Sequence, residues 1–126
     1  MEITLNHTIV PSHNNVDSAK FYAKIFDFEF VKEWAHFAIV KVNSSLSLDF
    51  VTATKEFSSH HYAFKVSDQE FDNIFNRIKS NQISFGSGPR SLEDGEINHH
   101  HNGRGVYFKD PSNHILEIIT TDYVLD

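Results

Sequence analysis

The sequence contains no cysteine. Disulfide bonds, thiolate metal sites and a cysteine nucleophile are therefore excluded, and the absence fits a reducing cytoplasm. No apolar run approaches the roughly 18 residues that a membrane-spanning helix needs. The N-terminus carries Glu2 and alternating polarity instead of a charged stretch followed by an apolar core, so no secretory signal peptide is expected. These absences predict a cytoplasmic protein without a membrane partner.

An excess of positive charge is lacking as well. Lys and Arg number 11 against 17 Asp and Glu, which gives a net charge of −6 at pH 7. A nucleic-acid-binding protein would present a basic face, so nucleic acid is not an expected partner. The length allows one compact domain, or two small halves that share a core. We expect a single domain over residues 1–126, built from modules at roughly 1–54 and 60–126.

The two halves of the chain repeat one order of elements. In the first half, hydrophobic periodicity predicts a strand, a helix and three strands over residues 3–10, 19–26, 28–34, 36–42 and 46–52. Asp17 or Ser18 is the expected helix cap. In the second half, the elements are expected at 61–66, 68–78, 83–85, 105–109 and 114–120, with a helix cap at Ser67 or Asp68. The predicted fold is α+β: two βαβββ modules forming a cupped mixed sheet, with the helices on its outer face.

Each half also carries a histidine on its first strand and a carboxylate on its last predicted strand. His7 precedes Asp49 of Leu48-Asp49-Phe50, and His61 precedes Glu117 of Leu116-Glu117-Ile118. A single histidine on an apolar strand face is more often a buried structural residue. Glu117, however, shares its strand face with Ile115 and Ile119. A carboxylate between two isoleucines is unfavourable unless it is paired or binds a cation. Two imidazoles and a carboxylate leave positions open on a metal ion, so His7, His61 and Glu117 predict a divalent metal site.

Two further polar residues have more than one interpretation. Asp49 is either a fourth metal ligand, an outer partner of the site or an exposed strand carboxylate, because its side chain is one methylene shorter than that of glutamate. Arg104, between Gly103 and Gly105, either holds an anionic substrate by a forked contact or is a solvated hairpin residue. The metal itself is open, since nitrogen–oxygen sites accept Fe, Mn, Co, Ni or Zn.

Four segments carry a family resemblance. They are Leu5-Asn6-His7, Ala19-Lys20-Phe21-Tyr22, His61-Tyr62-Ala63-Phe64 and the closing stretch from Tyr107 to Glu117. Together with the repeated βαβββ order, they resemble the vicinal oxygen chelate superfamily of glyoxalase I, extradiol dioxygenases, fosfomycin-thiol transferases and bleomycin-resistance proteins. The resemblance implies metal ligands at His7, His61 and Glu117, and a small-molecule substrate that chelates the metal through two oxygens. It also implies a homodimer, because small members often complete the cup with two chains.

Within that superfamily, three functions compete. The order Asn98-His99-His100, Val106-Tyr107, Asp110-Pro111, Glu117 resembles ring-cleaving dioxygenases and makes Tyr107 the hydrogen-bond donor to the substrate. A glyoxalase-like isomerase or lyase is the alternative, because Asp49 stands where those enzymes carry a ligand glutamate. The candidates for an acid–base histidine upstream of the second ligand are only His36 and His60. A non-catalytic drug-binding protein with structural histidines is the third possibility.

Overall fold

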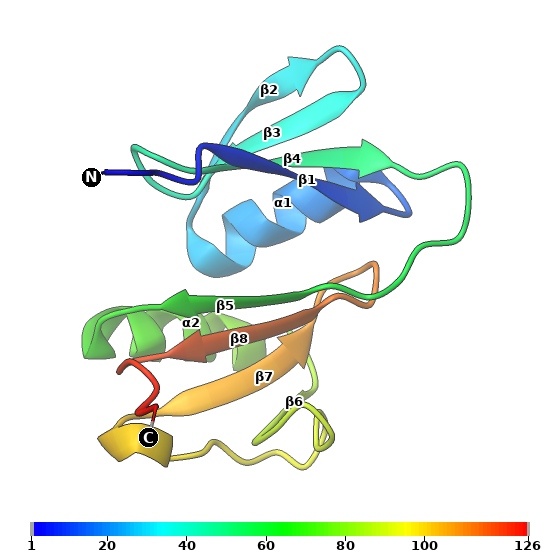
Figure 1. Ribbon diagram of the computed structural model, residues 1–126. Helices are drawn as coiled ribbons and strands as arrows, with labels where there is room; N and C mark the ends of the chain where they lie inside the picture. The colour runs from blue at the N-terminus through cyan, green and yellow to red at the C-terminus, as the bar shows by residue number, and fades with distance from the viewer. Residues whose placement is uncertain (1, 126) are drawn as a thin grey trace. The chain divides into compact units, whose positions relative to one another are not determined.

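The computed structural model describes residues 2–125 (Figure 1). The chain divides into two compact units, the first ending at Ser58 and the second beginning at Ser59. Each module contains one four-stranded mixed sheet and one long helix, in the order βαβββ. The predicted α+β class and paired modules are therefore confirmed, whereas a joint cup and a single domain over 1–126 stay predictions.

The first module consists of β1 (His7–Ser12), α1 (Asn15–Phe26), β2 (Glu29–Trp34), β3 (Phe37–Lys41) and β4 (Ser47–Thr52). Its strand order is β1-β4-β3-β2, with β1 parallel to β4 and the other pairs antiparallel. The predicted strand at 3–10 is displaced, because the backbone ladder with β4 runs from His7 to Ser12. Pro11 is tolerated inside β1 because β1 is an edge strand with one side free of ladder bonds.

Helix α1 begins earlier than its predicted caps. The side chain of Asn14 accepts the Asp17 backbone N–H at 2.9 Å and caps the helix, so the prediction of Asp17 or Ser18 as the cap was wrong. The helix ends at Asp27, which adopts a left-handed φ of 62°. Its buried face includes Tyr22, whose ring lies 4.8 Å from that of Phe50 on β4. This contact packs α1 against one face of the sheet and forms part of the core of the first module.

The second module consists of β5 (His61–Lys65), α2 (Asp68–Ser80), β6 (Phe85–Gly86), the 3₁₀ turn η1 (His100–Asn102), β7 (Gly105–Lys109) and β8 (Ile115–Ile119). Its strand order, β5-β8-β7-β6, repeats that of the first module. The turn η1 lies between β6 and β7. Among residues 2–125, no helix combines the length and the apolar character needed to cross a bilayer.

Strand alternation divides the second sheet into a helix face and an open face. The ring of Phe85 contacts Phe75 of α2 at 5.0 Å, and Phe85 pairs with Phe108, so this row faces the helix. Tyr107 and its partner Glu117 are offset by one residue and face the other way. The open face of the second module therefore carries the polar residues Tyr107 and Glu117.

The start of α2 carries a reciprocal capping box. Ser67 Oγ accepts the Glu70 N–H at 3.1 Å, and Glu70 Oε1 accepts the Ser67 N–H at 3.0 Å. We expect Ser67→Ala to lower the free energy of unfolding by about 1 kcal/mol near neutral pH, because one helix-terminal donor loses its acceptor. Urea titrations of the variant and the wild type measure the difference.

The same box predicts a pH dependence. The Ser67 backbone N–H, followed by its hydroxyl, lowers the pKa of Glu70 from its ordinary value of 4.5. Since the folded-state pKa lies below the unfolded one, this contribution is present above the ordinary value and is lost as the pH falls through the folded-state pKa. Glu70→Gln should thus destabilise near neutral pH and lose its effect in strong acid, with exposed Glu93→Gln as the control. An equal destabilisation at both pH values would contradict the assignment.

Candidate metal centre

His61 and Glu117 come together although they lie 56 positions apart in the sequence. His61 Nε2 lies 3.1 Å from Glu117 Oε1. The parallel pairing of β5 with β8 sets Ile115 opposite His61 and Glu117 opposite Ala63, so the two side chains share the open face. The predicted convergence of these two ligand candidates is therefore present within one module.

The hydrogen bond on the far side of the His61 ring fixes its tautomer. Nδ1 lies 3.1 Å from the carbonyl oxygen of Ile115, which can only accept, so Nδ1 carries the hydrogen. In the neutral ring, Nε2 then has a lone pair directed at a carboxylate oxygen. Two acceptors at this distance need a cation, either a proton on Nε2 or a metal ion. Both atoms can reach a single ion, because metal–nitrogen and metal–oxygen bonds are about 2.0–2.2 Å long.

Glu117 is the most constrained residue of the site. It is 2% exposed, although it lies on the open face of the sheet. Its second oxygen, Oε2, accepts the hydroxyl of Tyr123 at 2.5 Å. Burial of a carboxylate is unfavourable unless its oxygens are paired. Here Oε2 accepts from a phenol, whereas Oε1 faces His61 Nε2 and is paired only through a cation between the two atoms.

Tyr107 lies beside this pair. Its ring stacks on that of His61, with centroids 6.0 Å apart and planes at 15°. Burial raises the pKa of the Tyr107 hydroxyl above its ordinary value, and the hydrogen bond with Tyr123 adds to the effect. The phenol therefore keeps its proton and can donate it to a hydrogen-bond acceptor on the open face. Its predicted role as a substrate donor is consistent with this position and stays a prediction.

The first module repeats the register of the second. His7 pairs with Ser47 and Ile9 with Asp49, just as His61 pairs with Ile115 and Ala63 with Glu117. Asp49 therefore occupies the position in its sheet that Glu117 occupies in the other. The two modules differ on the neighbouring strand, where Ile39 stands opposite Asp49 and Tyr107 opposite Glu117.

In the first module, the side chains of His7 and Asp49 bond residues that are near them in the sequence. His7 is exposed, and its Nδ1 lies 2.7 Å from Asn6 Oδ1, which leaves Nε2 directed away from that bond. Asp49 is half-buried and accepts the Ser47 hydroxyl at 3.0 Å. Over the part of the chain from 2 to 125, neither module on its own gathers three histidine or carboxylate side chains into a metal-binding group.

Arg104 has partners within its own module. Its Nη1 donates to Asp72 Oδ1 at 2.7 Å, and its Nη2 donates to the Asp68 carboxylate and backbone carbonyl at 3.0 Å. The guanidinium also lies over the Phe71 ring at 4.4 Å. These contacts join the start of β7 to α2. The forked contact predicted from the sequence is thus made with helix carboxylates, and the structure favours a structural role over substrate binding.

The histidine candidates His60 and His99 have different surroundings. The backbone N–H of His60 donates to His114 Nδ1 at 2.8 Å. The Nδ1 atom of His60 lies 2.6 Å from the Tyr62 hydroxyl. Burial lowers the pKa of the His60 imidazole, with the neighbouring His114 acting in the same direction. His60 therefore belongs to a structural network at the start of β5. His99 is exposed and makes no capping bond to η1.

Two residues of the site were missed by sequence reasoning. Tyr123 follows β8 and reaches back to Glu117, while His101 stacks on Tyr123 with ring centroids 4.7 Å apart. A tyrosine six positions after the predicted ligand was a visible signal, but its direction depends on the path of the chain beyond β8. His101 lies in η1, and no sequence pattern places it beside Tyr123.

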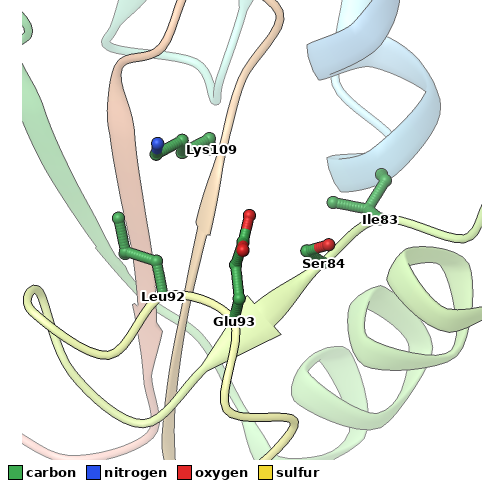
Figure 2. A pocket seen from close by; sticks show the side chains of 5 residues that line it. All are labelled: Ile83, Ser84, Leu92, Glu93 and Lys109. Carbon is green, nitrogen blue, oxygen red and sulfur yellow. The ribbon is translucent and has the colours of Figure 1, made fainter.

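A small pocket adjoins Glu117. Its lining residues are Asn98, His100, His101, Arg104, Glu117, Ile119, Thr121 and Tyr123. A second pocket lies at the β6 edge of the module, and Figure 2 shows the five side chains that line it, Ile83, Ser84, Leu92, Glu93 and Lys109. Lys109 is two residues beyond Tyr107 on β7, so both side chains leave the same face of the strand. The open face therefore also has a lysine ammonium beside it.

Comparison with known proteins identifies the family. The profile of the Glyoxalase/Bleomycin resistance protein/Dioxygenase superfamily matches residues 4–118, so the chain belongs to this superfamily. The solved structure of Oxidase ChaP-H2 is similar, with 41% identity, a TM-score of 0.93 and coverage of 98% of this chain and 97% of that one. Oxidase ChaP-H1 is 40% identical, with a TM-score of 0.90 and coverage of 96% and 98%.

More distant structures share the fold alone. The fosfomycin resistance protein FosX from Mesorhizobium loti is 20% identical, with a TM-score of 0.71 and coverage of 97% of this chain and 95% of that one. The family resemblance inferred from the sequence motifs is therefore confirmed.

The contacts of Arg104 lead to a test of its role. We expect Arg104→Met to lower the free energy of unfolding by about 1–2 kcal/mol, because two exposed ion pairs and one cation–π contact are lost. Metal affinity should not change, since the guanidinium bonds to α2 and not to His61 or Glu117. Denaturation and calorimetric metal titration measure the two quantities, with exposed Arg90→Met as the control. A large loss of metal affinity at unchanged stability would show that the structural assignment is wrong.

Proposed function

We propose that the protein is a divalent-metal-dependent oxidase or oxygenase that acts on a small oxygenated molecule. The observation that carries this proposal is the approach of His61 Nε2 to the buried Glu117 Oε1 at 3.1 Å, with His61 Nδ1 bonded to the Ile115 carbonyl. An imidazole whose other nitrogen is bonded to a backbone carbonyl is a common arrangement for a metal ligand. Membership of the superfamily supports the metal dependence.

His7 is the proposed third ligand. It occupies the position in its module that His61 occupies in the other, and its Nδ1 is likewise held by an oxygen acceptor, so that Nε2 is available. Either the same chain or the partner in a homodimer would supply this ligand. Asp49 is proposed as an outer carboxylate instead of a ligand, because its Oδ1 already accepts the Ser47 hydroxyl.

The chain's own groups define what the site can do. When bound, a divalent ion would supply Lewis-acid activation of the substrate oxygens and, if it is Fe or Mn, a redox-active centre for O₂. Tyr107 would donate its hydroxyl hydrogen in a hydrogen bond to a substrate oxygen, since its raised pKa keeps the phenol protonated. Lys109 on the same face favours a substrate with an anionic substituent.

Oxidative chemistry is proposed over isomerisation for two reasons. The similar proteins with 41% and 40% identity are named oxidases. In addition, Tyr107, the hydrogen-bond donor that the dioxygenase resemblance implies, pairs with Glu117 across β7 and β8, whereas Asp49 does not have the length of a glyoxalase-type ligand. A glyoxalase-like isomerase or lyase is the second candidate, and the position of Asp49 is the observation in its favour. A drug-binding protein without metal is the outcome if the titration below fails.

The ligand assignment is tested by metal titration. Changes in outer partners typically lower metal affinity by about 10–100-fold, so loss of a ligand should exceed about 100-fold. We therefore expect this effect from His61→Ala, Glu117→Gln and His7→Ala in calorimetric titrations with Zn²⁺ and anaerobic Fe²⁺. His36→Ala, an exposed histidine on the β2–β3 turn, is the matched control. Full metal occupancy in His61→Ala would end the proposal.

The reaction type requires a separate experiment. Oxygen uptake by the Fe²⁺-loaded protein with a panel of catechols, neutral and carboxylated, is compared with isomerisation of hemithioacetals by the Ni²⁺- or Zn²⁺-loaded protein. We expect oxygen uptake, and a decrease of about 100-fold in kcat for Tyr107→Phe because one donor to the developing charge is lost. Isomerisation without oxygen uptake would replace the proposed reaction by the glyoxalase-like one.

A further inference from the structure

We propose that Tyr123, on the segment that follows β8, is a positioning residue that orients the Glu117 carboxylate, and that His101 holds Tyr123 in place. This inference rests on the proposed function, because it assigns a purpose to the orientation of a proposed ligand. Neither residue belongs to the predicted ligand set: Tyr123 follows β8, and His101 lies in the 3₁₀ turn η1.

The first observation is the contact itself. The Tyr123 hydroxyl donates to Glu117 Oε2 at 2.5 Å, while Oε1 faces His61 Nε2 at 3.1 Å. The two oxygens of one buried carboxylate are thus directed to different partners. A carboxylate in this arrangement has one orientation, because rotation about its last bond would break the charge-assisted bond to the phenol.

The second observation is the way the segment is anchored. The His101 ring stacks on Tyr123 with planes at 27°, and the backbone N–H of Val124 donates to His101 Nδ1 at 2.9 Å. The Thr121 hydroxyl also donates to the backbone carbonyl of His101 at 3.0 Å. His101 therefore contacts Thr121, Tyr123 and Val124, in the segment whose Tyr123 hydroxyl bonds Glu117.

Backbone geometry gives the third observation. His101 and Asn102 have consecutive φ values of 56° and 60°, in the left-handed region that residues other than glycine adopt infrequently. Both residues lie in η1, and the His101 ring of this turn stacks on Tyr123. Such conformations persist when the surrounding contacts determine them, and here those contacts lead to the candidate ligand.

Substitution of one hydroxyl tests the inference. Tyr123→Phe keeps the ring that stacks on His101 and removes the donor to Oε2, together with the 3.5 Å hydroxyl contact to Tyr107. We expect a loss of about 10–100-fold in affinity for Zn²⁺ and anaerobic Fe²⁺, as is typical when an outer partner of a ligand is removed. Tyr62→Phe is the matched control, because it removes a phenol hydroxyl from the same module that bonds His60 instead. His101→Ala should cause a similar loss, since the anchor is removed.

A readout on the metal-free protein separates this inference from the proposed function. The ¹³C shift of the Glu117 carboxyl carbon should change in Tyr123→Phe and remain unchanged in Tyr62→Phe. Wild-type metal affinity in Tyr123→Phe would overturn the positioning role and leave the proposed function standing. If the wild type binds neither Zn²⁺ nor Fe²⁺, the proposed function fails, and the carboxyl shift alone then decides whether Tyr123 orients Glu117. An unchanged shift would overturn the inference in either case.

Discussion

The site depends on the burial of one carboxylate. Glu117 is 2% exposed, and such a buried carboxylate persists only when its oxygens have partners. Its partners come from the first strand of the module and from the segment after the last one. The parallel register of β5 and β8, the stacked Tyr107 ring and the anchored Tyr123 all act on this one side chain.

The two modules have the same register but different surroundings for their acids. Glu117 has an imidazole and a phenol as partners, whereas Asp49 is half-buried and bonds only the serine two residues before it among the described contacts. The residue opposite each acid differs too, tyrosine in one module and isoleucine in the other. The repeat has therefore become asymmetric: the second module concentrates the polar chemistry, and the first offers His7.

Sequence reasoning succeeded where the signal was local. The repeated βαβββ order follows from alternation and helical periodicity within short windows, and Ser67 was among the predicted caps of α2. It failed for the start of β1, which the ladder with β4 sets, and for the cap of α1, where Asn14 lies before the first apolar residues. For Arg104 the sequence left a substrate contact and a solvated hairpin residue open, because no local pattern indicates that two carboxylates of α2 lie beside it.

The sequence by itself determined the family, the module order and the residue types that can bind a metal, because each is encoded in neighbouring residues. Only the tertiary structure decided that His61 offers Nε2 to Glu117, that Tyr123 holds the second carboxylate oxygen, and that His101 anchors Tyr123. These contacts depend on strand register and on the path of the chain after β8. Both are set by packing across many residues, and no short stretch of sequence contains that information.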